Sequence, residues 1–250
     1  LATPNGATSI SYAAFEGCGS IISIEIPASV TSFGSFAFTD MPNLEQVTLK
    51  EGLTTLGDNG SLFLNCAKLK NVTLPSSLRT IGNDAFSYTG IESIVIPEGI
   101  TELTEGIFDG CKKLNSVTLP STLTTIGASA FLDCTALASI SIPASVTTVG
   151  SSAFSGCTAL VSVVFERDEN NDCELTTFGN NVFQGCTALT EIVLPSSLSK
   201  LGLMCFYGWT EEQTIKMDGF GGPMFEWNIN WYGTSKAVVV WNWVKPETAD

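Results

Sequence analysis

The sequence predicts a solenoid, an elongated coil in which each short repeat packs only against its neighbours. A phenylalanine recurs nine times at intervals of 22 to 29 residues, five of the eight intervals being 23, and a fixed period in this range is typical of repeat architectures. The apolar content of 44% and the charged content of 14% argue against disorder. We therefore expect one elongated body built around Phe15, Phe38, Phe63, Phe86, Phe108, Phe131, Phe154, Phe183 and Phe206.

The first half of each repeat predicts a strand. In the repeat at 114–136, Val117 and Leu119 alternate with polar residues, which indicates a strand with one buried face. Pro120 then ends the strand, because proline offers no N–H to a neighbouring strand. Stacked repeats would align these strands into one parallel sheet, about 4.8 Å apart. The same proline recurs as Pro27, Pro75, Pro97, Pro143 and Pro195.

The second half predicts a tight return around the phenylalanine. Ile126 belongs to a second short apolar segment that is expected to face inward. Gly127 is expected to adopt a turn conformation that is unfavourable for a residue with a Cβ atom. Ala130 is small enough for close approach, and Phe131 fills the interior. In register, the rings would form one continuous stack, each contributing roughly 1.5–3 kcal/mol by burial. The turn glycine recurs as Gly34, Gly57, Gly82, Gly150, Gly179 and Gly202.

These positions together resemble the BspA-like class of leucine-rich repeats. Residues 134–157 follow the repeat of that family almost throughout, reading Cys-Thr-Ala-Leu-Ala-Ser-Ile-Ser-Ile-Pro-Ala-Ser-Val-Thr-Thr-Val-Gly-Ser-Ser-Ala-Phe-Ser-Gly-Cys. The resemblance covers residues 1–209. It implies a right-handed, curved leucine-rich repeat solenoid of about nine repeats of about 23 residues, with a parallel β-sheet face and a first repeat cut at the N-terminus.

The resemblance also implies a secreted or surface-exposed bacterial protein. Family members include adhesins that bind host proteins or other cells, and the family has no common catalytic site, so no catalytic or cofactor-binding residue is carried over. Leu1 falls inside a repeat, since Pro4 precedes Phe15 by 11 residues as Pro120 precedes Phe131. We expect a processed or trimmed chain whose precursor carries more sequence upstream, including the targeting signal.

The composition disfavours several classes of binding partner and several kinds of catalytic and metal site. The net charge of −14 disfavours nucleic acid and anionic membranes, because both select basic patches. The longest apolar run, 237–243, is far shorter than the roughly 18 residues of a membrane helix, so we expect no membrane insertion by this segment. The absence of histidine removes Ser–His–Asp and Cys–His catalysis and the commonest transition-metal ligand. We expect a non-enzymatic protein without a cofactor.

The cysteines follow the repeat. Side chains at one repeat position point the same way, whereas a disulfide needs converging Cβ atoms, so we expect small buried hydrophobic residues rather than disulfides. A ladder of metal sites is the alternative, but the C-x-x-C spacing of such sites is missing. Cys173 and Cys205 lie off the column, as free thiols or as a pair. The column itself, three residues after the phenylalanine, is Cys18, Cys66, Cys111, Cys134, Cys157 and Cys186.

Two acidic segments suggest candidate sites. In the longest interval, Asp168, Asn170 and Asp172 have the spacing of oxygen ligands in a calcium loop, but Cys173 replaces the glycine of such loops, which favours a solvated acidic bulge. Paired carboxylates can also hydrolyse glycans. The acids of the fifth repeat favour a solvated edge over that chemistry; they are Glu92, Glu98, Glu102, Glu105 and Asp109.

The last residues, 210–250, predict a C-terminal cap packed on the last repeat. Strands are expected at 213–217 and 237–243, and a solenoid end needs a cover for its open core. Large aromatic residues suit this task, and the alternative is an exposed aromatic platform for sugar rings. All five tryptophans lie near this end, at Trp209, Trp227, Trp231, Trp241 and Trp243, with Phe220, Phe225 and Tyr232 beside them.

The outward positions of the predicted sheet form the candidate binding surface. In leucine-rich repeats, which the sequence resembles, this face commonly binds the ligand, although Thr and Val at these positions are explained equally well as good strand residues. We expect a protein or glycan ligand, and the fold together with the implied export makes adhesion the favoured function. A spacer that presents another domain is the alternative, and a glycan-active enzyme that uses Glu102 or Glu105 is a weaker one. The outward column is Glu25, Thr48, Thr73, Val95, Thr118, Ser141, Val164 and Val193.

Overall fold

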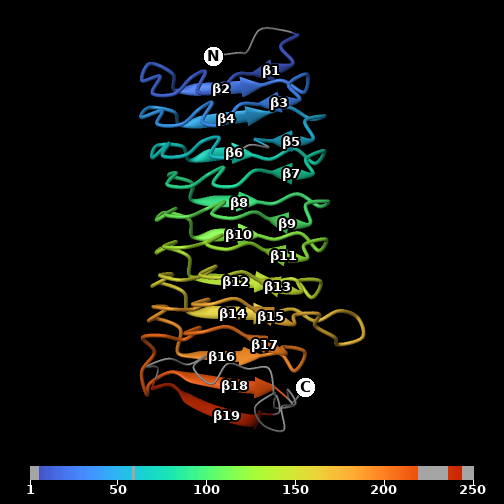
Figure 1. Cartoon of the computed structure of the whole chain (residues 1–250), viewed down its shortest axis with the longest axis vertical. Coiled ribbons are helices and arrows are strands. Elements are labelled where there is room, and N and C mark those ends of the chain that lie inside the picture. Colours follow the sequence, from blue (N-terminus) through green and yellow to red (C-terminus); the bar gives the residue numbers. More distant parts are fainter. Residues whose placement is uncertain (1–5, 58–59, 219–235, 244–250) are drawn as a thin grey trace, which may run out of the picture.

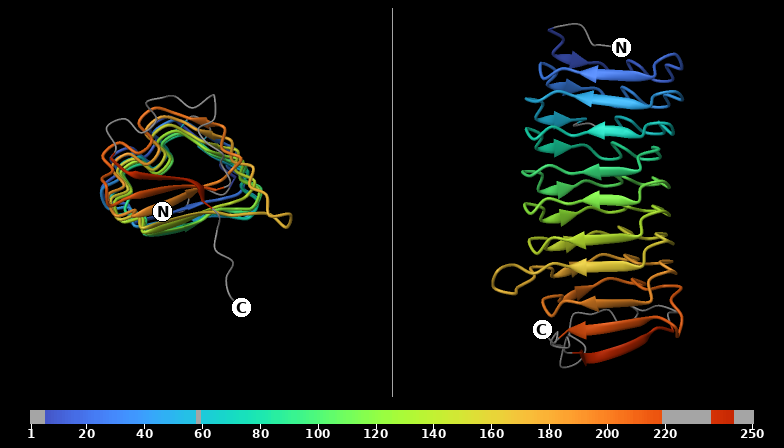
Figure 2. Two further views of the ribbon diagram at one scale, coloured as in Figure 1. Left: turned by 90° about the horizontal axis from the view of Figure 1, so that it is seen from below. Right: turned by 180° about the vertical axis from the view of Figure 1, so that it is seen from behind.

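The computed structural model describes residues 6–57, 60–218 and 236–243. In that part of the chain the regular elements are all β-strands, joined by turns. The coils stack one below another along the long axis of the molecule, with the N-terminal coil at one end and β19 at the other (Figure 1). Seen along this axis, the coils superpose around a common interior (Figure 2). The predicted solenoid is confirmed.

Each complete repeat contributes one longer strand and one strand of two residues, and all the pairings are parallel. The longer strands are β2 (Ser23–Ile26), β4 (Gln46–Leu49), β6 (Asn71–Thr73), β8 (Ser93–Val95), β10 (Ser116–Thr118), β12 (Ser139–Ile142), β14 (Ser162–Phe165), β16 (Glu191–Leu194), β18 (Thr214–Asp218) and β19 (Val238–Trp243). The short strands are β1 (Ser9–Ile10), β3 (Ser32–Phe33), β5 (Thr55–Leu56), β7 (Thr80–Ile81), β9 (Glu102–Leu103), β11 (Thr125–Ile126), β13 (Thr148–Val149), β15 (Thr177–Phe178) and β17 (Lys200–Leu201).

The longer strands form the parallel sheet face that the sequence predicted, but its hydrogen bonding is interrupted. The face divides into β2-β4-β6, β8-β10, β12-β14 and β16-β18-β19. Within each piece the repeats pair without a shift from β2 to β18, so that Ile24 lies opposite Val47 and Ile140 opposite Val163. This register places every inward residue over its equivalent in the next coil.

The interior contains the predicted phenylalanine stack. Eight consecutive ring pairs, from Phe15 to Phe206, have centroids 5.2 to 5.9 Å apart and planes within 20° of parallel. The rings from Phe38 onward are fully buried, whereas Phe15 in the first described coil is half-buried. Neighbour-only packing explains the difference, because an end coil has one stacking partner and a central coil has two.

The turn around each phenylalanine from Phe15 to Phe183 is hydrogen-bonded to the equivalent turn of the next coil. Around Phe131, the N–H groups of Ser129, Phe131 and Asp133 each donate to a carbonyl of the next coil at 2.8 Å. Two positions of the turn have a positive φ in all nine repeats, as at Ser129 (55°) and Asp133 (54°). The residues two before the phenylalanine are Ala13, Phe36, Ser61, Asp84, Gly106, Ser129, Ser152, Asn181 and Met204, and those two after it are Gly17, Asp40, Asn65, Tyr88, Gly110, Asp133, Gly156, Gly185 and Gly208.

The expectation that the repeat glycine supplies a special turn conformation is wrong for most repeats. Only Gly57 among these glycines has a positive φ, of 73°. The others are required by close approach: a Cβ on Gly127 would lie 2.6 Å from the Leu103 carbonyl oxygen, and one on Gly150 would lie 2.5 Å from the Ala128 nitrogen. These contacts are with the backbone of the preceding coil, which cannot move without disturbing the stack.

The cysteine column is buried as predicted from Cys66 onward, and Cys18 is half-buried. All eight cysteines are free thiols. The thiols also act as hydrogen-bond donors, a role that was not predicted: Cys134 Sγ donates to the Phe108 carbonyl oxygen at 3.2 Å, one coil back. Cys66, Cys111, Cys157 and Cys186 make the same bond at 3.0 to 3.1 Å.

Residues beyond 209 continue the stack. The strands expected at 213–217 and 237–243 are observed as β18 and β19. Trp209 is buried, packs edge-to-face on Phe206 at 4.9 Å, and donates its indole N–H to the Phe183 carbonyl oxygen. Phe220, Phe225, Trp227, Trp231 and Tyr232 lie outside the described residues. The aromatic cap and the division of the chain at 209/210 stay predictions.

Candidate binding face

The eight candidate binding residues lie in one outward row across the longer strands. Glu25 is opposite Thr48 and Thr48 opposite Thr73, while Val95 pairs with Thr118 and Ser141 with Val164. Each is exposed or half-buried. The row continues through Lys216 and Val240, which are in register with Val193. The repeat pattern ends before β18, so these two residues could not be predicted from it.

A second outward row lies beside the first, two residues earlier in each strand. This second row was not predicted as a binding surface, although the alternation of side chains along a strand requires it. Four consecutive repeats place a serine there, so the centre of the face is lined with small hydroxyl groups. This row consists of Ser23, Gln46, Asn71, Ser93, Ser116, Ser139, Ser162, Glu191, Thr214 and Val238.

A groove with a volume of about 740 Å³ crosses the face over β6, β8 and β10. It spans the interruption between β6 and β8, which belong to separate hydrogen-bonded sheets. Val95, which is 65% exposed, projects into it. The remaining apolar lining comes from Val72, Leu74, Ile94 and Pro97, with Thr and Ser side chains between them.

Two carboxylates line the groove where the strands end. Glu51 Oε1 accepts a hydrogen bond from the Ser76 N–H at 3.0 Å, and its Oε2 accepts from the Ser76 hydroxyl at 3.1 Å. Glu98 repeats this fork two coils later, with both bonds from Ser121 at 3.1 Å. The backbone hydrogen bonds from the two serines lower the pKa of Glu51 and of Glu98. Both groups are therefore fixed in place and ionised at neutral pH.

The two ends of the face carry ion pairs. Lys50 Nζ lies 3.1 Å from Glu25 Oε2 beside β2 and β4. Lys216 Nζ lies 2.7 Å from Glu191 Oε2 on β16 and β18. Near this second pair, Val161 and Val164 are 57% and 51% exposed. The charged groups at the ends are thus neutralised within the face, in contrast to the two carboxylates of the groove.

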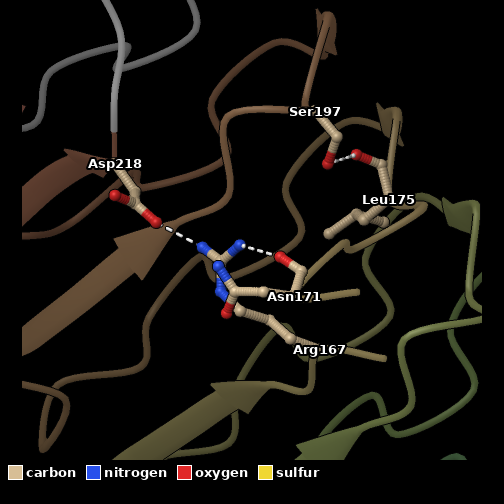
Figure 3. A network of polar contacts seen from close by, with 5 residues as sticks. All are labelled: Arg167, Asn171, Leu175, Ser197 and Asp218. Atoms are coloured by element: carbon tan, nitrogen blue, oxygen red, sulfur yellow. Dashed lines mark hydrogen bonds and ion pairs between the residues drawn. The ribbon is translucent and has the colours of Figure 1, made fainter. Parts of the chain in front are cut away.

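The calcium candidate loop bulges from the stack at the 29-residue interval. Asp168 Oδ1 accepts from the N–H groups of Asn170 and Asp172 at 2.9 and 2.8 Å, so this carboxylate already closes the turn of the loop. Arg167 donates to the Asn171 carbonyl oxygen at 2.9 Å and pairs with Asp218 at the end of β18 (Figure 3). In the described residues no cluster of three or more acidic, cysteine or histidine side chains could hold a metal ion.

The acidic residues of the fifth repeat do not gather at one place. Glu102 and Glu105 are exposed at and after β9, and neither lines the groove, whereas Glu98 does. Burial raises the pKa of Asp109, while a hydrogen bond from Tyr88 acts in the opposite direction. The glycan-active hypothesis therefore has no pair of carboxylates facing a common cleft among these residues.

A profile described as "BspA type Leucine rich repeat region" matches residues 1–115 and 79–213 in six copies. No curated protein matches the chain. In the described residues, no helix has the length and apolarity that a membrane crossing requires.

Several solved structures are similar to the chain. A leucine-rich repeat protein from Bacteroides ovatus is 27% identical, with a TM-score of 0.79 over 97% of this chain and 63% of its own. A leucine rich cell surface protein from Faecalibacterium prausnitzii is 26% identical, with a TM-score of 0.60 over 84% of this chain and 64% of its own. The pneumococcal vaccine antigen PcpA, at 19% identity and a TM-score of 0.55, shares the fold over 95% of this chain and 58% of its own. The chain thus spans less than two thirds of each.

Proposed function

The chain belongs to the BspA-type leucine-rich repeat family, and we propose that it is a non-enzymatic interaction protein of the bacterial surface or the extracellular space. Its role in this proposal is adhesion, through the outward face of the longer strands, to proteins of a host or of other cells. A location outside the cell is supported by the similar Faecalibacterium prausnitzii protein, which is described as a cell surface protein.

The observation that carries the proposal is the continuous outward face itself. It extends in register over successive coils, combines exposed valines with hydroxyl groups, and is hollowed over β6, β8 and β10. An extended, rigid and chemically mixed surface is what solenoids present to macromolecular partners. Large side chains such as Trp and Arg do not project from the two outward rows between β2 and β16, so affinity depends on area and on placed charges rather than on aromatic anchors.

Binding of the purified chain to immobilised matrix proteins and to intact cells tests the proposal. The variant Thr73→Arg/Thr118→Arg places two bulky charges on the face and should abolish binding. Thr54→Arg/Thr101→Arg, at exposed positions next to the short strands, is the matched control and should bind like the wild type. Binding that is unchanged in the first pair, or lost equally in both, would contradict a role of this face.

A spacer is the second candidate, and the regular stack favours it. The phenylalanine stack runs without a break from Phe15 to Phe206, which fixes the distance between the two ends of the repeats, as a spacer must. If the repeats bind no protein or cell surface while a neighbouring domain of the same polypeptide does, the spacer function is supported and adhesion by this chain is wrong.

A further inference from the structure

The groove over β6, β8 and β10 differs from the rest of the face in its electrostatics. Its lining includes the Glu51 and Glu98 carboxylates and no lysine or arginine. Elsewhere on the face, Glu25 and Glu191 are paired with lysines. Among the described residues, neither carboxylate of the groove forms an ion pair, and the hydrogen bonds from Ser76 and Ser121 orient them. The Arg79 guanidinium, which lies beside Gly99, donates instead to the Ser76 and Leu78 carbonyl oxygens. A cationic ligand therefore complements this groove.

The spacing of the two carboxylates restricts the ligand further. They belong to equivalent positions two coils apart, which corresponds to about 10 Å at the usual spacing of strands. A polypeptide in the polyproline II conformation advances about 3.1 Å per residue with three residues per turn, so two side chains three residues apart lie on the same side of it and span about 9 Å. Between the carboxylates, Val95, which is 65% exposed, offers an aliphatic surface, and the lining contains no aromatic ring on which a sugar could stack.

We propose that this groove binds an extended basic segment of a partner protein, running along the solenoid axis. Two lysine or arginine side chains, three residues apart, reach Glu51 and Glu98, and an aliphatic side chain between them covers Val95. This inference rests on the proposed function of the face and adds the chemistry of the partner.

Fluorescence anisotropy with a labelled octapeptide, Ser-Lys-Val-Thr-Lys-Val-Ser-Gly, tests the inference at low ionic strength. Two exposed charge pairs are worth about tenfold in affinity together, so Glu51→Gln/Glu98→Gln should weaken binding by about that factor. Val95→Lys, which adds a positive charge at an exposed position, should also weaken it. The control Glu16→Gln/Glu105→Gln removes the same charge at exposed positions outside the groove and should leave the affinity within about twofold.

Three results would overturn the inference: no binding of the octapeptide at millimolar concentration, equal weakening in both double variants, or equal affinity for a peptide with its two lysines adjacent. Melting temperatures of all variants verify that they fold. The proposed function is judged separately. If Thr73→Arg/Thr118→Arg abolishes binding to a surface protein while Glu51→Gln/Glu98→Gln retains it, the face binds its partner but not through a basic segment in this groove.

Discussion

Polar atoms of single residues join each coil to the one before it. The Cys134 thiol and the Ser145 hydroxyl both donate to carbonyl oxygens of the preceding coil, at 3.2 Å and 2.7 Å. Trp209 takes the place of the repeat cysteine and makes the same bond with its indole N–H. Because buried donors need acceptors, a donor at these positions depends on a carbonyl oxygen of the preceding coil. Met41, buried at the repeat position of the cysteines, has no donor, so that position requires a fitting size but not a donor.

Gly127 should not tolerate even one extra methyl group. We expect Gly127→Ala to lower the free energy of unfolding by about 1–3 kcal/mol, because the new Cβ overlaps backbone atoms of the preceding coil. Gly19→Ala is the control: its Cβ would lie 3.7 Å from the nearest atom, Pro42 Cγ, and its φ is not positive, so stability should hardly change. Urea unfolding measures both, and equal effects would contradict the close-approach explanation.

The buried thiols should be unreactive in the folded protein. Burial raises the pKa of the Cys66, Cys186 and Cys205 thiols to about 12, so at pH 8 almost none of each is in the reactive thiolate form. We expect only the half-buried Cys18 and Cys173 to react rapidly with Ellman's reagent. All eight should react after unfolding in guanidinium chloride. Rapid native reaction of more than two thiols would show that the coils open.

At the scale of elements, the inserted loop shows how the stack accommodates a repeat that is longer than the others. Although 29 residues separate Phe154 from Phe183, β13 and β15 remain in register, with Thr148 opposite Thr177. The additional residues leave the coil as the loop that Arg167 connects to Asp218. The insertion is thus accommodated outside the stack, as expected of surface loops.

The Arg167 contact should restrain this loop rather than stabilise the whole protein. Arg167→Gln should accelerate cleavage after Glu169 by a glutamate-specific protease several-fold, because the loop loses its connection to β18. The melting temperature should change little, since exposed ion pairs contribute less than about 1 kcal/mol. Arg79→Gln, distant in the stack, is the control. Unchanged cleavage in Arg167→Gln would mean that the loop is held by its internal hydrogen bonds alone.

For the whole molecule, stability should depend on the position of a coil in the stack. Each coil contacts only its neighbours, so the first described coil, where Phe15 is half-buried, lacks the second stacking partner that Phe131 has. Opening from an end breaks one interface, whereas opening at the centre breaks two. In this chain, the coil that contains Phe15 is therefore expected to open locally before the central coils do.

Hydrogen exchange measures this gradient directly. The Phe15 and Phe131 amides make the same inter-coil hydrogen bond, at 2.8 Å to Ala37 and Ala153. We expect the Phe131 amide to exchange slower by at least about two orders of magnitude, because its exchange requires more of the stack to open. Equal protection of the two amides would indicate that the repeats unfold as one unit.

The sequence by itself determined the solenoid, the strand that precedes Pro120, the phenylalanine stack and the outward row from Glu25 to Val193. These features follow from a fixed period, because a repeated residue must meet its own equivalent in the next coil. The tertiary structure decided what depends on the distances between coils: the steric reason for Gly127, the acceptors of the thiols, the interruptions of the sheet, and the groove that joins Glu51 to Glu98 across 47 residues of chain. Those distances are set by all the packed side chains together, and no single repeat contains that information.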